Sequence, residues 1–309
     1  VTDSGAVRHV ATNGSVTTIA GMLGTHDFAD GVGSAARFKR PQGMALSGTT
    51  LVVADPGNMR IRSIDLTTNT VTTIAGMAAV GAIDGPALSA SFNNPTGVAF
   101  SGADVLVADY FNPLIRKISN GVVTTVGGRM PAVGLTDGVG SAARFNLPTS
   151  LAADADGAIY VLDRNNAAIR KMSGTTTTTF VSGSQLSLPR AMIASGTEGF
   201  VVAETNRLLN VSATGVITAM AGSVTPANVD GAALSARFKT ISALAMDAAG
   251  QVLIAESGNC QIRILATDGT VTTLAGKAST TSVDNCRFAD GTGVTATFNN
   301  PTALAVGTT

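Results

Sequence analysis

A short phrase recurs six times along the chain, and this repetition limits the possible folds more than any other feature. A clear copy begins at Pro95 with Pro-Thr-Gly-Val-Ala and continues through Val107-Ala108-Asp109, Ile115-Arg116 and Val123-Thr124-Thr125. The copies start at Pro41, Pro95, Pro148, Pro189, Ile241 and Pro301, in steps of 54, 53, 41, 52 and 60 residues. Repeats of this length indicate a solenoid or a propeller.

Each repeat predicts four short strands. In the copy after Pro41 we expect them at residues 43–46, 51–54, 61–64 and 71–75. These runs are rich in β-branched residues and are bounded by turn residues such as Ser47-Gly48. They are apolar nearly throughout, which is typical of a small sheet that is covered on both faces.

The two ends of the chain predict how the array closes. Residues 1–3, 7–10 and 16–21 match the last three strands of a repeat, whereas residues 300–306 match a first strand. We therefore predict an all-β, six-bladed β-propeller of four-stranded antiparallel blades, closed by a composite blade from both termini. The prediction is a single domain over residues 1–309, with blades near 41–76, 95–128, 148–183, 189–222, 241–276, and 301–309 plus 1–21.

A second element precedes five of the six copies. It consists of Asp-Gly, a turn of small residues and Phe eight residues after the Asp, at Asp30 and Phe38, Asp84 and Phe92, Asp137 and Phe145, Asp230 and Phe238, and Asp290 and Phe298. With these motifs the chain resembles NHL-repeat six-bladed β-propellers of the bacterial, secreted type. The resemblance implies the fold but no single activity, because such propellers include scaffolds, RNA and protein binders, and a few lyases.

The Asp of the Asp-Gly element has a structural interpretation. We expect Asp30 to cap one short helical turn while Phe38 packs between blades. Five calcium loops are the alternative, but calcium loops place oxygen ligands at alternate positions, and Asp30 is followed by Gly, Val, Gly and Ser.

An acid and an arginine also recur seven residues apart, on strands that a hairpin brings together. We expect cross-strand ion pairs, since a catalytic carboxylate would occur once. The pairs are Asp55 with Arg62, Asp109 with Arg116, Asp163 with Arg170, and Glu256 with Arg263, while Glu204 lacks such an arginine.

The expected topology places the long connections and one opening of the central channel on the same face. Loops on a rigid scaffold often carry binding sites. A polar rim is expected at this channel mouth from Arg40, Gln42, Asn94, Thr96, Thr149, Arg190, Thr240, Ser242, Asn300 and Thr302. The rim could bind a small polar or anionic ligand, or it could be polar only because water reaches it.

Composition argues against several partners. The chain has no Trp and zero net charge, which disfavours a lectin and a nucleic-acid binder. No apolar run could span a bilayer and no signal-peptide segment opens the chain, so we expect a soluble, already trimmed protein. Tyr110 and Phe111 form a candidate partner-binding pair, with packing under a neighbouring loop as the alternative.

Catalytic signals are weak. His9 and His26 fall in different kinds of segment and predict no metal site, and the expected rim contains no carboxylate. We expect no cofactor. A metal-assisted lyase or hydrolase with its site at the channel mouth is the alternative function.

The two cysteines, Cys260 and Cys286, fall on the same face, and Cys286 lies in the longest connection. We predict a disulfide between them, with two unpaired thiols as the alternative, and hence an extracellular or periplasmic location. The sequence thus favours a binding module of a secreted or cell-surface bacterial protein that contacts a protein or a small polar ligand. It predicts no nucleic-acid partner and no membrane span.

Overall fold

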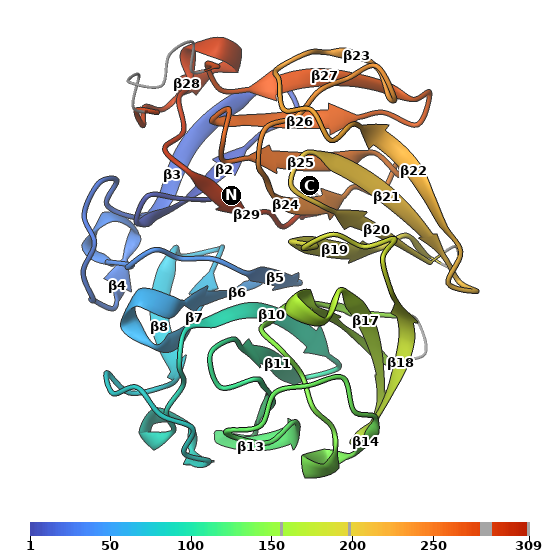
Figure 1. Ribbon diagram of the computed structural model, residues 1–309. Helices are drawn as coiled ribbons and strands as arrows, with labels where there is room; N and C mark the ends of the chain where they lie inside the picture. Colours follow the sequence, from blue (N-terminus) through green and yellow to red (C-terminus); the bar gives the residue numbers. More distant parts are fainter. Residues whose placement is uncertain (155–156, 197–198, 279–285, 308–309) are drawn as a thin grey trace.

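Six antiparallel β-sheets stand around a common centre (Figure 1). The computed structural model describes residues 1–154, 157–196, 199–278 and 286–307. The predicted six-bladed propeller is confirmed, and each sheet is one blade. The middle of the longest connection, residues 279–285, and the last two residues of the sixth predicted blade, 308–309, lie outside the described residues.

The first three blades follow one another along the chain. Blade I contains β5 (Met44–Ser47), β6 (Thr50–Asp55), β7 (Arg60–Asp65), β8 (Thr70–Ala75) and the short β4 (Gly31–Val32). Blade II contains β10 (Pro95–Ser101), β11 (Asp104–Asp109), β12 (Leu114–Ser119), β13 (Val122–Gly127) and the short β9 (Gly85–Pro86). Blade III contains β15 (Pro148–Ala153), β16 (Ile159–Asp163), β17 (Ala168–Ser173), β18 (Thr176–Ser182) and the short β14 (Gly138–Val139).

The remaining blades include one without a short strand and one built from both chain ends. Blade IV contains β19 (Ala191–Ala194), β20 (Gly199–Ala203), β21 (Arg207–Ser212) and β22 (Ile217–Gly222). Blade V contains β24 (Ile241–Met246), β25 (Val252–Glu256), β26 (Gln261–Leu265), β27 (Thr270–Ala275) and the short β23 (Gly231–Ala232). Blade VI contains β29 (Pro301–Ala303), β1 (Thr2–Asp3), β2 (Ala6–Val10), β3 (Ser15–Gly21) and the short β28 (Gly291–Thr292).

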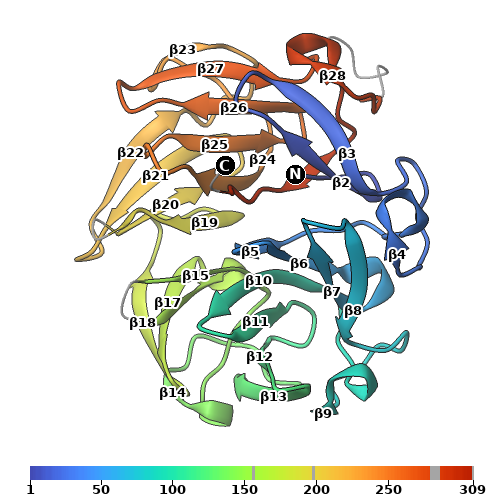
Figure 2. The same ribbon diagram turned by 180° about the vertical axis from the view of Figure 1, so that it is seen from behind.

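The composite blade closes the ring as predicted. Thr2 of β1 pairs with Ala303 of β29, and Val16 of β3 pairs with Gly291 of β28. Figures 1 and 2 show from opposite sides that the red C-terminal end of the chain lies in one blade with the blue β2 and β3. Strand pairing between the two ends of the chain therefore holds the last blade together.

The core lies between neighbouring blades rather than within one sheet. One cluster joins Val7 and Ala20 of blade VI to Val53 and Ile64 of blade I, and it includes Phe38. The phenylalanines that follow the Asp-Gly element are fully buried, as expected: Phe38, Phe92, Phe145, Phe238 and Phe298. Among the described residues, no helix is long and apolar enough to cross a lipid bilayer.

The Asp-Gly element forms an additional strand that the sequence did not predict. In five blades the glycine and the next residue pair with the outermost long strand, as Gly31 does with Val71 of β8. A 3-10 turn follows, as in η1 (Gly33–Ala35), η3 (Ala87–Ser89), η4 (Gly140–Ala142) and η7 (Gly293–Thr295). These five connections thus cross from one blade to the outer edge of the next before they reach the centre.

The expected capping role of Asp30 is wrong. No side chain caps the first turn of η1, whose N-cap is Val32. The Asp30 carboxylate instead accepts hydrogen bonds from Arg62 of β7 and from the backbone N–H of Thr73 of β8, the latter at 3.1 Å. A buried guanidinium attracts the carboxylate more strongly than a 3-10 turn of three residues does.

Candidate functional site: the channel mouth

The first long strands of the six blades (β5, β10, β15, β19, β24 and β29) surround a central channel of about 620 Å³. Aliphatic residues line its deeper part, among them Met44, Leu46, Leu244 and Leu304. Polar residues line the end where these strands begin, which we call the channel mouth: Gln42, Asn94, Thr96, Thr149, Arg190, Ser242, Asn300 and Thr302.

The channel mouth thus brings together eight of the nine residues predicted to bind a ligand. Their binding role stays a prediction. Arg40 lies outside the lining, as does Thr240, which the sequence also placed on the rim. Arg40 is exposed, because its long side chain extends into solvent, so its charge does not contribute to the channel wall.

Several hydroxyl groups of the channel mouth connect adjacent blades. Thr302 Oγ1 donates to the carbonyl of Pro41 at 2.7 Å, and Ser242 Oγ donates to the carbonyl of Pro301 at 2.6 Å. Thr96 Oγ1 donates to the Thr149 carbonyl of the next blade at 3.4 Å. These hydroxyls are already engaged in holding the ring, so they are poor candidates for direct ligand contacts.

Other polar groups at the channel mouth are unengaged. Within the described part of the chain, the side-chain amides of Gln42, Asn94 and Asn300 have no hydrogen-bond partner. An amide offers two donors and an acceptor, so these three side chains can exchange their water for a ligand without breaking an internal bond.

The sequence missed a second group of lining residues. Tyr110, Arg164 and Ser257 come from the loops between the second and third long strands of blades II, III and V, and all three line the channel. Each directly follows the acid that ends the second strand. The position after the Asp or Glu of the repeat therefore identifies these lining residues in the sequence. Arg164 Nη1 donates to the Tyr110 hydroxyl at 3.1 Å.

The candidate aromatic pair divides between two environments. Tyr110 lines the channel, whereas the Phe111 side chain is 56% exposed. Their rings meet edge to face with centroids 4.9 Å apart. Neither residue lies wholly beneath a neighbouring loop, and their role in partner binding stays a prediction.

The predicted acid–arginine pairs form, and each arginine also binds the Asp of the Asp-Gly element. Arg62 Nη1 lies 3.0 Å from Asp55 Oδ2, and its Nη2 lies 2.6 Å from Asp30 Oδ1. Arg62 Nε also donates to Asp30 Oδ1, and the last two N–H groups donate to the carbonyls of Ala29 and Arg37, so all five donors are satisfied. The guanidinium stands 5.0 Å from the centre of the Phe38 ring, as in a cation–π contact.

Buried acids in these clusters have perturbed titration. Burial raises the pKa of Asp109 to about 6 despite hydrogen bonds from Asn93, Asn112 and Arg116. Burial has the same effect on Asp163, whose pKa rises to about 6. Strong shifts often mark catalytic groups, but here the same arrangement repeats around the ring, which supports a structural role.

Blade IV departs from this pattern. Glu204 pairs with Arg207 instead of an arginine seven residues later, and it accepts a hydrogen bond from the backbone N–H of Ser187 at 2.6 Å. Its blade also lacks the Asp-Gly element and the fifth strand. Blade IV therefore keeps the acid, Glu204, which binds the backbone just before its first strand, and replaces the rest of the cluster.

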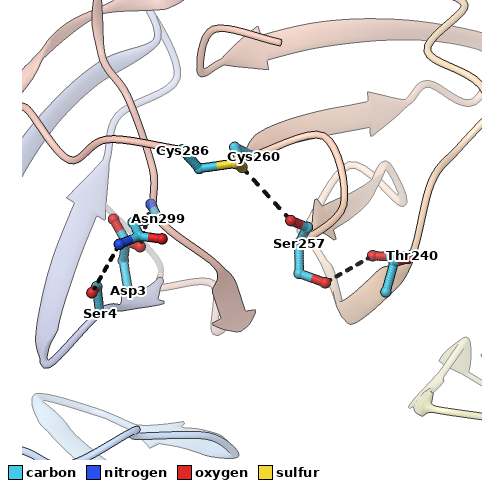
Figure 3. The surroundings of a disulfide bond; sticks show 7 residues. All are labelled: Asp3, Ser4, Thr240, Ser257, Cys260, Cys286 and Asn299. Carbon is cyan, nitrogen blue, oxygen red and sulfur yellow. Dashed lines mark hydrogen bonds between the residues drawn. A yellow bond between two sulfur atoms is a disulfide. The ribbon is translucent and has the colours of Figure 1, made fainter. Parts of the chain in front are cut away.

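The predicted disulfide between Cys260 and Cys286 is confirmed (Figure 3). Its Cα atoms are 5.9 Å apart. Cys260 follows Ser257 of the channel mouth, and the Ser257 hydroxyl donates to the Thr240 carbonyl at 3.1 Å. The bond ties the long connection to a loop that reaches the channel, and structural disulfides are typical of proteins outside the cytoplasm.

Possible metal ligands do not gather in the described residues, where no three His, Cys, Asp or Glu side chains form a group that could hold an ion. The channel lining contains no carboxylate. The side chains available for ligand contacts are therefore amides, guanidinium groups and a phenol.

The closed ring of six four-stranded sheets, with its central channel, defines the class of six-bladed β-propellers. Residues 145–172 match the NHL repeat. NHL repeat-containing protein 2 from Gallus gallus is 42% identical over 84 residues, which are 26% of this chain and 11% of that protein. Residues 145–172 are therefore similar to an NHL repeat, within a chain that folds as a six-bladed β-propeller. The chain spans about a tenth of the curated relative it matches.

Two solved bacterial structures are similar to it in fold. A protein of unknown function from Bacteroides thetaiotaomicron VPI-5482 superposes with a TM-score of 0.71 at 20% identity, covering 94% of this chain and 70% of that one. An auxiliary nutrient binding protein from Bacteroides ovatus ATCC 8483 superposes with a TM-score of 0.69 at 17% identity, covering 94% and 71%.

Proposed function

We propose that this propeller is a binding module of a secreted or cell-surface bacterial protein, and that its channel mouth takes a small polar ligand. The observation that carries the proposal is the set of unengaged amides of Gln42, Asn94 and Asn300 at the entrance of the channel. Amides that reach solvent are hydrated in the empty channel, and a ligand can replace this water with its own hydrogen bonds.

The dimensions of the channel support this function. Its volume of about 620 Å³ falls within the range of small-molecule sites. Such sites combine an apolar wall with a few placed polar groups, and this channel has aliphatic residues below its polar mouth. A ligand could therefore place polar groups at the mouth and a less polar part deeper.

The proposed location is extracellular or periplasmic. The Cys260–Cys286 disulfide supports it because disulfides persist in oxidising compartments. The fold similarity to a protein described as an auxiliary nutrient binding protein agrees with a ligand-binding role at the cell surface.

The test is a variant that fills the entrance. We expect Gln42→Trp to weaken the binding of a small polar ligand at least tenfold, because the indole would occupy the space between the amides. Isothermal titration calorimetry against sugars, amino acids and organic acids measures the effect. The melting temperature of the variant confirms that it folds.

Leu88→Trp is the matched control, because Leu88 is exposed and lies outside the lining. It introduces the same indole away from the channel and should leave ligand binding unchanged. Ligand binding that survives Gln42→Trp, or that is lost in Leu88→Trp, would place the site elsewhere.

A further inference from the structure

One side of the channel mouth carries two arginines from neighbouring blades. Arg164 begins the turn after β16 in blade III, and Arg190 precedes β19 in blade IV. Both line the channel together with Tyr110. We propose that Arg164 and Arg190 form an anion subsite, so that the ligand of the channel mouth carries a carboxylate or phosphate group. This proposal rests on the ligand-binding function above.

Neither guanidinium has a negative partner. Across the residues that the structure describes, Arg164 and Arg190 make no ion pair, and no carboxylate lines the channel around them. To the described residues, their side chains donate hydrogen bonds only to neutral hydroxyls, from Arg164 to Tyr110 at 3.1 Å and from Arg190 Nε to Thr205 Oγ1 at 3.4 Å.

Other arginines of the blades have negative partners. Arg62, Arg116 and Arg170 each bind two carboxylates. The chain therefore compensates its buried guanidinium groups elsewhere and leaves this pair uncompensated. An unpaired charge with reduced contact with water is costly, and an anionic oxygen in the channel would offset that cost.

The two charges also act on each other. The pKa of Arg190 lies below its ordinary value, first because the side chain is partly buried and then because the positive charge of Arg164 is near; Tyr110 opposes the shift. Arg190 stays protonated all the same, since a guanidinium group does not lose its proton in proteins. Two like charges held together in reduced contact with water repel, and a bound anion would remove this repulsion.

Access to the pair is open. The connection between blades III and IV runs only from Gly183 to Pro189 and has no Asp-Gly element, so no long connection precedes Arg190. Guanidinium groups bind carboxylate and phosphate through paired N–H donors, and two of them can hold one anion from two sides. The free amide of Asn94 lines the same channel mouth and can bind the neutral part of the ligand.

The experiment compares charged probes with a neutral analogue at low ionic strength. The probes are succinate, inorganic phosphate and succinamide, and the variants are the double substitution Arg164→Gln/Arg190→Gln and the control Arg129→Gln. Arg129 is an exposed arginine outside the channel lining. We expect succinate or phosphate to bind saturably, at least tenfold more weakly to the double variant and equally well to the control. Binding should weaken as salt is added.

A second measurement needs no ligand. Arg190→Gln should raise the melting temperature of the ligand-free protein at low ionic strength, because it removes one of two repelling charges, and the gain should shrink in high salt. Arg129→Gln should produce no such gain. A salt-independent fall in the melting temperature of Arg190→Gln would show that Arg190 has a structural role and would overturn the proposal.

The outcomes separate this proposal from the ligand-binding function. If succinamide binds as well as succinate, or if the double variant retains full affinity, the anion subsite is wrong. If Gln42→Trp abolishes the binding in either of these two cases, the ligand still binds at the channel mouth and the proposed function holds. If no probe and no compound of the calorimetric panel binds at the channel mouth, both proposals fail.

Discussion

At the scale of single residues, a buried arginine recurs in five blades, as Arg8, Arg62, Arg116, Arg170 and Arg263. It is the centre of an arrangement of which blade IV keeps only the acid, Glu204. Arg62 pairs across the sheet with Val53 and Thr73, and in blade IV the same register is occupied by Leu209, paired with Val202 and Ala219. The Asp of the Asp-Gly element is absent there as well. Exchanging a whole buried ion cluster for apolar residues is often neutral, whereas removing one member is costly.

The first residue-scale prediction tests this asymmetry. Arg62→Leu should lower the free energy of unfolding by about 3–5 kcal/mol, because it leaves the fully buried Asp55 without its cation. Arg207→Leu, which breaks the partly exposed pair with Glu204, should cost less. Urea unfolding of both variants measures the difference. Equal losses of unfolding free energy would show that the buried cluster contributes no more to stability than the partly exposed pair.

At the scale of elements, the four long strands of each blade could be predicted from the sequence. Runs of β-branched residues mark the strands, and turn residues between the runs mark their ends. The fifth strand could not be predicted in this way. It is only two residues long, as in Gly31–Val32, and it pairs with a strand about 40 positions later. Local periodicity carries no information about such a pairing, and for the same reason Asp30 was assigned to a local cap rather than to Arg62.

The element-scale prediction concerns the disulfide. Replacing both Cys260 and Cys286 by Ser should lower the free energy of unfolding by roughly 3 kcal/mol, the chain-entropy value for closing a loop of this size. The sequence separation is 26 residues. Thermal unfolding of the variant, and of the unmodified protein with and without reductant, measures the loss. An unchanged stability would mean that other contacts hold this connection, for instance Arg8 with Asp290.

At the scale of the whole molecule, ring closure decides what the channel mouth contains. The polar rim could be predicted, because every copy of the repeat places its first strand at the centre. The proximity of Arg164 to Arg190 could not, because these residues come from different loops and come near each other only when blades III and IV pack side by side. The number of blades and their closure thus follow from the repeat, whereas the charge of the site follows from where the repeat is broken.

Blade IV has an outer edge that no fifth strand covers, and this has a consequence for amide hydrogen exchange. In other blades an Asp carboxylate accepts the backbone N–H of a threonine near this edge, as Asp30 does for Thr73, Asp84 for Thr125 and Asp230 for Thr273. Among the described residues, Ala219 occupies this register without such an acid. We expect the Ala219 amide to exchange its hydrogen faster than those of the three threonines in mass-spectrometric or NMR measurements. Similar rates would contradict this. Faster exchange would show that the Asp of the Asp-Gly element protects the outer edge of a blade.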